Sequence, residues 1–370
     1  MQRSKLESLT FLRFIAAAIV VIFHFGRGTE VHKALPAIFS SGPIMVTFFF
    51  VLSGFVISIS HVGRDMSLGE FYFNRLARIA PIYIVALAVF VLAYNGPYFT
   101  TGVILSAGFL QAWFPPFPLS ANAPGWSISV EIFFYAISPL LLIVANVGEK
   151  KSYAKWLFAG IVFWIGTQFV LAQLNKSPFY AGYPSVSHDL IHYFPVSHLC
   201  SFILGFAGGI AYRNNFLIGL SGWKALILFF ISLAMASYIA ENARFLNDAF
   251  GVKFAFGGSF YAAIFLPVIY FCVLSDKLLS KVLALPFLVL LGEASYSLYI
   301  LQKPAYIYFD RALAGVQFSG ADTKFYCFFL FLIVVSIVSY LVIEKPVVML
   351  AKKAVRMVSE RRSEICPSAG

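Results

Sequence analysis

The chain has 370 residues, of which 60% are hydrophobic and only 12% are charged, and its mean hydropathy is +0.85. About 25% of the residues of an ordinary soluble domain are charged, so this composition excludes a soluble globular protein. A net charge of +11 raises the question of nucleic acid binding. Because the positive charges fall between apolar segments, we expect no nucleic acid partner and infer a membrane protein.

Apolar segments long enough to span a bilayer recur along the whole chain. A spanning helix needs roughly 20 mostly apolar residues. Ten segments qualify: 9 to 26, 43 to 61, 79 to 95, 126 to 147, 154 to 174, 193 to 212, 223 to 240, 258 to 275, 286 to 308 and 325 to 344. The pattern predicts an all-α polytopic membrane protein with about ten transmembrane helices.

Two other apolar stretches are interpreted differently. Residues 99 to 113 are too few to span and lead into Pro115 and Pro116, so we predict an interfacial or re-entrant piece. The first segment follows Arg3 and Lys5 as a secretory signal would, but no small-x-small cleavage site follows it. We therefore expect this segment to be retained as the first helix.

The placement of Lys and Arg predicts the orientation, because cytoplasmic loops retain these residues. Most of the 27 fall on the side of the N-terminus, and the stretch from 95 to 125 has none. Both termini are therefore predicted to be cytoplasmic. We expect one transmembrane domain, residues 1 to 350, and a basic tail, residues 351 to 370, suited to the lipid bilayer's anionic headgroups.

The four cysteines, Cys200, Cys272, Cys327 and Cys366, form no CxxC pair and are predicted to be free thiols. A zinc site from His188, His192 and His198 is conceivable because the first two are spaced i, i+4. Pro184 precedes this trio and Pro195 falls between its second and third members, so we favour the absence of a metal. No GxSxG, GxxxxGK or HExxH pattern occurs, which removes the commonest soluble hydrolase, nucleotidase and zinc protease classes.

Ionisable residues inside the apolar segments are functional candidates, because they are costly in a bilayer. Arg13 and His24 are 11 residues apart, about 16 Å along one helix and close to one face of it. Arg75 and Arg78 also share a face, at the cytoplasmic entry to the third span. Glu131 falls about 7 Å from the outer end of its helix, at a depth similar to that of His24. The spacing predicts a cationic inner mouth and a His–carboxylate pair further out.

Each of these residues also has a structural interpretation. Arg75 and Arg78 could be anchors that follow the positive-inside rule. His24 could be a hydrogen-bonded packing histidine, and Glu131 could be a counter-ion for a cation at a helix end.

Several motifs together resemble the membrane-bound acyltransferase-3 family. The first helix matches the family pattern of Arg, Ala, Val and His at Arg13, Ala16, Val20 and His24. Further similar blocks, in the family's order, are Phe49-Phe50-Val51-Leu52-Ser53-Gly54-Phe55, the Arg-x-x-Arg of Arg75 and Arg78, Trp126-Ser127-Ile128-Ser129-Val130-Glu131, Ser295-Tyr296-Ser297-Leu298-Tyr299 and Glu344-Lys345-Pro346. One position departs from the family: Gln302 stands where a histidine often follows the Ser-Tyr-Ser-Leu-Tyr block.

The resemblance implies an O-acetyltransferase of the polysaccharide-modifying type in the bacterial inner membrane, without a fused esterase-like domain. It implies transfer of an acyl group, usually acetyl, from cytoplasmic acyl-CoA to a carbohydrate hydroxyl, with acetyl-CoA as donor and no metal. Coenzyme A carries phosphates, which three arginines could hold. The expected site residues are catalytic His24 and Glu131, donor-binding Arg13, Arg75 and Arg78, and acceptor-binding Trp126, Ser127, Tyr296 and Gln302.

Two questions of mechanism stay open from the sequence. His24 could act as general base on the acceptor hydroxyl or carry the acyl group transiently, with Glu131 orienting the imidazole. The alternative function is a proton-coupled transporter or flippase that uses His24 and Glu131 as a relay.

Overall fold

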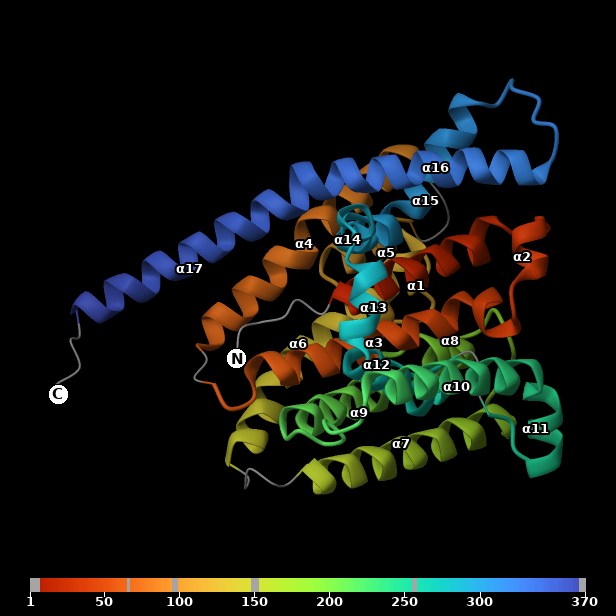
Figure 1. Cartoon of the computed structure of the whole chain (residues 1–370). Coiled ribbons are helices and arrows are strands. Elements are labelled where there is room, and N and C mark those ends of the chain that lie inside the picture. Colours follow the sequence, from red (N-terminus) through yellow and green to blue (C-terminus); the bar gives the residue numbers. More distant parts are fainter. Residues whose placement is uncertain (1–6, 65–66, 95–98, 148–152, 255–257, 366–370) are drawn as a thin grey trace.

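The computed structural model describes residues 7–64, 67–94, 99–147, 153–254 and 258–365, and within these ranges every regular element is a helix. Most of the long helices run side by side in one bundle (Figure 1). The long helices are α1 (Glu7–Phe25), α3 (Gly42–His61), α4 (Leu68–Ala93), α6 (Trp126–Val147), α7 (Tyr153–Lys176), α9 (Pro195–Arg213), α10 (Gly222–Glu241), α12 (Ala262–Leu274), α15 (Ser295–Ala312), α16 (Ala321–Ser339) and α17 (Lys345–Ile365).

Shorter elements connect or cap these helices. They are α2 (Glu30–Ala34), η1 (Ala37–Ser40), α5 (Phe99–Ala107), η2 (Gln111–Trp113), η3 (Ala123–Gly125), α8 (Val186–His192), α11 (Ala243–Phe250), η4 (Ser259–Tyr261), α13 (Asp276–Leu283), α14 (Pro286–Glu293) and the π-helix η5 (Tyr340–Glu344). The nine residues of α5 span only about 14 Å, too little to cross a bilayer, as its sequence predicts.

The structure confirms an all-α polytopic membrane protein and revises the number of spans. Within the described ranges, eight helices are long and apolar enough to cross a membrane, or nine if the bent pair of 259–274 and 276–283, which meets at 81°, is one span. The predicted segment 286 to 308 is divided between α14 and α15. Polar residues explain why α15 fails as an apolar span, since Gln302, Lys303, Asp310 and Arg311 all lie on it.

Helices α3 and α9 form the centre of the bundle, where most of their residues are buried. Two glycines bring their backbones together. A Cβ added at Gly54 would collide with the carbonyl oxygen of Phe202, and one added at Gly205 would collide with that of Val51. Small residues at such contacts are the usual route to close packing of membrane helices. The Gly54 of the second sequence block therefore serves packing.

Helices α7, α10 and α16 lie at the periphery, with few buried residues and many exposed apolar side chains. This distribution matches helices that face lipid, because hydrocarbon solvates an apolar surface as well as a protein core does. At the upper edge of the view, α16 leads through η5 into α17, and α17 extends past the other helices (Figure 1). The helix passes residue 350 without a break.

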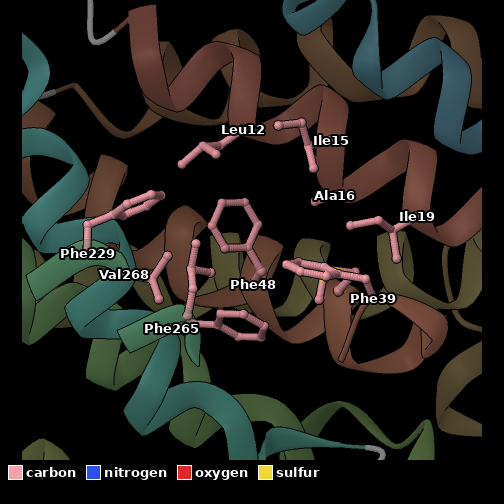
Figure 2. A pocket seen from close by; sticks show the side chains of 11 residues that line it. Leu12, Ile15, Ala16, Ile19, Phe39, Phe48, Phe229, Phe265 and Val268 are labelled. Atoms are coloured by element: carbon pink, nitrogen blue, oxygen red, sulfur yellow. The ribbon is translucent and has the colours of Figure 1, made fainter. Parts of the chain in front are cut away.

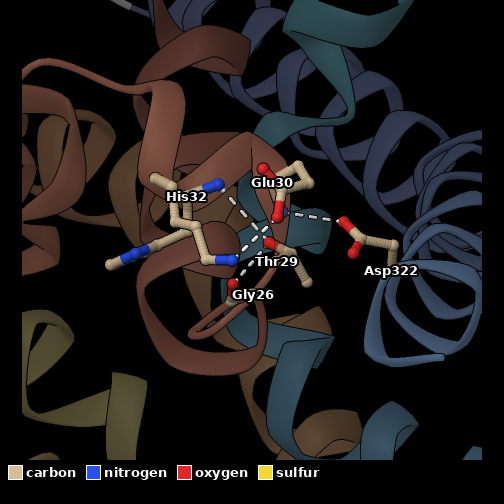
Figure 3. A network of polar contacts seen from close by, with 6 residues as sticks. Gly26, Thr29, Glu30, His32 and Asp322 are labelled. Atoms are coloured by element: carbon tan, nitrogen blue, oxygen red, sulfur yellow. Dashed lines mark hydrogen bonds and ion pairs between the residues drawn. The ribbon is translucent and has the colours of Figure 1, made fainter.

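A polar network ties the end of α1 to the start of α16 (Figure 3). The Thr29 hydroxyl donates to the carbonyl oxygen of Gly26 and accepts from the backbone N–H of His32, which caps α2. The backbone N–H of Glu30 donates to Asp322 Oδ1 at 2.8 Å. These contacts fix the end of the helix that carries Arg13 and His24.

Candidate active site

Three arginines from two helices gather at one side of the bundle, and we call them the arginine cluster: Arg13 on α1, with Arg75 and Arg78 on α4. Their guanidinium groups lie within electrostatic range of one another, since Arg78 acts on both Arg13 and Arg75. The Arg75 guanidinium lies 5.5 Å from the ring centroid of Phe71 and 5.8 Å from that of Tyr135. Aromatic faces of this kind hold a guanidinium in place without neutralising its charge.

The cluster is not neutralised by direct ion pairs. Among the described side chains, no ion pair within 4.0 Å involves these three arginines; the pairs Lys33–Glu30 and Lys324–Asp310 both lie outside the cluster. Arg78 is exposed and the other two arginines are half-buried, so the cluster opens at the surface of the protein. A planar guanidinium offers five fixed donors suited to phosphate. The arrangement can therefore accept an anionic group from outside the protein.

Two carboxylates border the cluster at a greater distance. Glu344, the last residue of η5, is 6% exposed, accepts a hydrogen bond from the Ser297 hydroxyl and acts electrostatically on Arg13. Glu131 on α6 accepts from the Tyr135 hydroxyl and, at 3.5 Å, from that of Ser53. Glu131 also acts on Arg13 and Arg75. Both carboxylates are held by hydroxyl groups in positions that stabilise the three cations.

The sequence does not predict the Glu344 contact, although Glu344 belongs to the Glu-Lys-Pro block that resembles the family. Glu344 and Ser297 are 47 residues apart, and the π-helical turn that ends at Glu344 is not visible in the apolar pattern. Single π-helical turns occur frequently at functional sites. This turn is the only one that the described residues contain, and it supplies the carboxylate beside Arg13.

His24 lies near the opposite end of α1 and pairs with Gln302 on α15. His24 Nδ1 is 2.7 Å from Gln302 Oε1. The His24 side chain is exposed, whereas Gln302 is completely buried. His24 and Gln302 belong to two different motif regions, 278 positions apart in sequence, and are direct partners in the structure.

Two cations lie close enough to His24 to act on it electrostatically: Lys303 and Arg27. Lys303 Nζ lies 5.6 Å from the ring centroid of Phe90, and the Arg27 guanidinium lies 4.7 Å from that of Phe23. Lys303 and Arg27 thus place positive charge close to His24.

The predicted His24–Glu131 pair is not formed by a direct contact. In the ranges that the structure covers, no hydrogen bond joins these two residues, because His24 pairs with Gln302 and Glu131 with Tyr135 and Ser53. Equal depth in the bilayer does not bring two side chains together unless their helices also turn the right faces to each other. Glu131 faces the arginine cluster.

The four predicted acceptor-binding residues all make contacts with other residues of the protein in this structure. The Ser127 and Tyr299 hydroxyl oxygens are 2.9 Å apart, and the Tyr296 hydroxyl donates to the Ile79 carbonyl oxygen at 2.9 Å. The Trp126 ring packs near His198. Gln302 lies behind His24 with both ends of its amide hydrogen-bonded. Contact of these residues with an acceptor stays a prediction.

The histidines near α8 form a stack instead of a chelate. The rings of His188 and His192 lie 4.2 Å apart, and His198 Nε2 is 3.0 Å from the carbonyl oxygen of His192. No group of three or more His, Cys, Asp or Glu side chains among the described residues could hold a metal ion. Cys200, Cys272 and Cys327 are free, and Cys366 lies outside the described residues.

A small apolar cavity of about 40 Å³ lies between α1, α3, η1, α10 and α12 (Figure 2). Its wall includes Leu12, Ile15 and Ile19, which lie on a different side of α1 from Arg13 and His24. Every labelled side chain around it is hydrocarbon (Figure 2). The cavity offers no polar group for catalysis and is too small for a substrate.

Comparison with known proteins identifies a family for nearly the whole chain. The family model described as an acyltransferase domain matches residues 6–345. An acyltransferase from Streptomyces mycarofaciens is 31% identical over 229 residues, covering 57% of this chain and 58% of the relative. A Staphylococcus aureus protein provisionally named an O-acetyltransferase is 23% identical over 365 residues, covering 86% of this chain and 56% of the relative.

An uncharacterised Haemophilus influenzae protein is 31% identical over 150 residues, covering 35% of this chain and 61% of the relative. The chain thus spans a little over half the length of these curated relatives. No solved structure matches the chain.

Proposed function

Because this chain belongs to the acyltransferase-3 family, we propose that it transfers an acyl group, most simply acetyl, from cytoplasmic acyl-CoA to a carbohydrate hydroxyl on the far side of the bacterial inner membrane. The match over residues 6–345 confirms the family resemblance read from the motifs. The donor, the acceptor and the membrane are our proposals. The arrangement of charged groups along α1 supports the donor, and the family supports the carbohydrate acceptor and the bacterial inner membrane.

The observation that carries the proposal is the separation of two kinds of group on one helix. Arg13, the member of the arginine cluster on α1, lies about 16 Å along that helix from His24. Coenzyme A needs cations for its phosphates and a reactive group at the far end of a long, thin arm. We propose that the arginine cluster binds the phosphates and that the thioester reaches His24.

The proposed reaction uses His24 as general base. Its imidazole takes the proton of the acceptor hydroxyl while the hydroxyl oxygen attacks the thioester carbonyl carbon. The tetrahedral intermediate then expels the coenzyme A thiolate, the new ester bond replaces the thioester bond, and the proton passes from the imidazolium to the departing sulfur. Lys303, which acts electrostatically on His24, is placed to stabilise negative charge that develops near the imidazole.

In this proposal Glu131 supports the arginine cluster, whereas its depth along α6 predicts a partner for His24. Its hydrogen bonds with Tyr135 and Ser53 and its electrostatic effect on Arg13 and Arg75 support a role in holding the arginine cluster. Buried or half-buried cations need such compensation when no ligand is bound.

The test is acyl transfer by the purified protein in proteoliposomes. Acyl-labelled acetyl-CoA is supplied with candidate carbohydrates, and the label in carbohydrate ester and the release of free thiol are both measured. Equal amounts of ester and thiol are expected. Movement of carbohydrate across the vesicle without thiol release would reject the enzyme and favour the transporter.

The acceptor can be sought in cells. Surface and exported glycans from cells with and without the gene are compared by mass spectrometry, and loss of a 42 Da acetyl increment on a carbohydrate is expected for an acetyl group. An acyl difference confined to proteins or to simple phospholipids would reject a carbohydrate acceptor.

A further inference from the structure

The amide of Gln302 is hydrogen-bonded at both ends. Its Nε2 donates to the carbonyl oxygen of Tyr299 at 2.6 Å, and its Oε1 lies 2.7 Å from His24 Nδ1. Gln302 is 0% exposed, so water does not compete for either end.

The Tyr299 carbonyl decides which way this amide points. A carbonyl oxygen only accepts hydrogen bonds, so the NH₂ end of the amide must face it. The oxygen end must then face His24, and His24 Nδ1 must donate. A neutral imidazole carries a single N–H. The ring is therefore protonated on Nδ1, which leaves the lone pair on Nε2.

We propose that Gln302 is a positioning residue that holds neutral His24 in the Nδ1–H tautomer, so that Nε2 is the atom that takes the acceptor's proton. The second half of this inference rests on the proposed function, and the tautomer itself does not. The exposed fractions agree with it, because the buried Gln302 covers the Nδ1 edge while the His24 side chain remains accessible.

Neighbouring contacts hold the amide where the proposal needs it. The Tyr299 hydroxyl bonds with Ser127 at 2.9 Å and with the carbonyl oxygen of Pro124 at 3.2 Å. Asn122 Nδ2 donates to the Ile300 carbonyl oxygen at 2.8 Å. The start of α6 and the segment before it thereby fix the turn of α15 that presents both the Tyr299 carbonyl and Gln302.

Gln302 differs in its hydrogen bonding from the histidine that often stands at this position in the family. A histidine at position 302 could donate to or accept from His24, depending on its own protonation. A glutamine whose NH₂ group is already bonded to a carbonyl can only accept. An amide also adds no negative charge, so it orients the ring without stabilising the imidazolium as a carboxylate would. Gln302 thus selects one tautomer of an uncharged base.

The direct test is nitrogen NMR of the wild-type protein in nanodiscs, with ¹⁵N in its six histidine rings. Signals that disappear in His24→Asn identify the residue, and spectra are taken at a pH where His24 is neutral. A protonated Nδ1 and an unprotonated Nε2 are expected. A proton on Nε2 in the wild type would overturn the proposal, whatever the activity.

Two variants connect the tautomer to the reaction. Gln302→Leu removes the acceptor, and Gln168→Leu is the matched control, because Gln168 is also buried but bonds with Ser259 at 3.0 Å. Gln302→Leu should move proton occupancy toward Nε2 and lower kcat at least about tenfold, though by less than the 10²- to 10⁴-fold contribution of a whole general base. KM for acetyl-CoA should not change, and the control should alter neither the tautomer nor kcat.

The outcomes separate the tautomer from the proposed function. Unchanged kcat in Gln302→Leu with a changed tautomer would overturn the positioning role. An Nδ1–H tautomer in a protein that transfers no acyl group would retain the hydrogen-bond assignment and reject the proposed function. If Gln302→Leu does not fold, Gln302→His tests the same role, since it should show a mixture of tautomers and an intermediate kcat.

Discussion

Asn122 places its side-chain amide nitrogen 2.8 Å from the carbonyl oxygen of Ile300 in α15. Pro304 stands four residues after Ile300, at the position whose backbone N–H would otherwise bond to this carbonyl. Proline has no backbone N–H, so residue i−4 of a helix loses its usual donor. A buried carbonyl without a donor is costly. The proline in α15 and the asparagine before α6 are therefore two halves of one interaction.

This pairing predicts a coupled effect on stability. Asn122→Ala should destabilise the protein by about 1–3 kcal/mol, because it leaves the Ile300 carbonyl without a donor. The loss should be smaller in a Pro304→Ala background, where the backbone N–H of residue 304 can bond to Ile300. Thermal unfolding in detergent measures all four proteins. Asn175→Ala, which removes an exposed contact with Lys253, is the control and should have little effect.

The close contact of α3 with α9 predicts a second effect on stability. Gly205→Ala should destabilise by about 1–3 kcal/mol, because its methyl group would overlap the Val51 backbone. Gly166→Ala on α7 is the matched control: nothing lies within 4 Å of its added Cβ. That change should be neutral or stabilise by up to about 1 kcal/mol, as alanine favours a helix. Equal unfolding temperatures of the two variants would contradict the packing assignment.

The sequence predicts much of this fold because span length and apolar composition are local properties. It places α1, α3 and α9 within a few residues of their observed bounds, and the spacing of Arg13 and His24 gives their shared face. It does not predict the break between α14 and α15. Of the polar residues that make α15 a poor span, Gln302 is completely buried and bonds to partners inside the bundle.

A local sequence pattern does not predict which side chains of different helices contact each other in the candidate site. Depth along a helix follows from residue number, and equal depth alone predicts a pair of Glu131 with His24. The rotation of α6 about its own axis depends on its packing with α3. Ser53 on α3 contacts Glu131 in this packing. The partner of His24 is 278 residues away in sequence, and only the assembled bundle reveals it.

The predicted orientation is tested by labelling single cysteines with an impermeant thiol reagent. With the native cysteines replaced, Thr100→Cys should react from outside the cell and Arg64→Cys only after permeabilisation; both native residues are exposed. Ala121, in the same positive-free stretch, is 2% exposed and should react poorly from either side. Labelling of Thr100→Cys from the cytoplasm alone would reverse the topology.

Donor binding by the arginine cluster predicts a loss of affinity. Arg75→Ala and Arg78→Ala should each weaken acetyl-CoA binding about 10- to 150-fold, since a charge-assisted contact contributes roughly 1.5–3 kcal/mol. Arg64→Ala removes an exposed arginine outside the cluster and should leave affinity unchanged. Affinity is measured by equilibrium binding in detergent, independently of turnover. Unchanged affinity in both cluster variants would favour the alternative in which Arg75 and Arg78 only anchor the helix in the membrane.

The last prediction separates His24 from Glu131. His24→Ala should lower acyl transfer by roughly 10²- to 10⁴-fold, the contribution of a general base, while acetyl-CoA still binds. Glu131→Gln should instead tighten acetyl-CoA binding a few-fold, because it removes negative charge beside Arg13 and Arg75.

The double variant decides between two roles for Glu131. If Glu131 acts only on the arginine cluster, its effect on acetyl-CoA affinity should be the same with His24 or Ala at position 24, within about 0.5 kcal/mol. If Glu131 instead orients His24 as part of one catalytic unit, Glu131→Gln should lower kcat in the wild type and add almost nothing to His24→Ala. That second pattern would mean that α6 turns Glu131 toward His24 during the reaction. Transfer by His24→Ala within about tenfold of the wild-type rate would remove His24 from the chemistry, since it falls short of a general base's contribution.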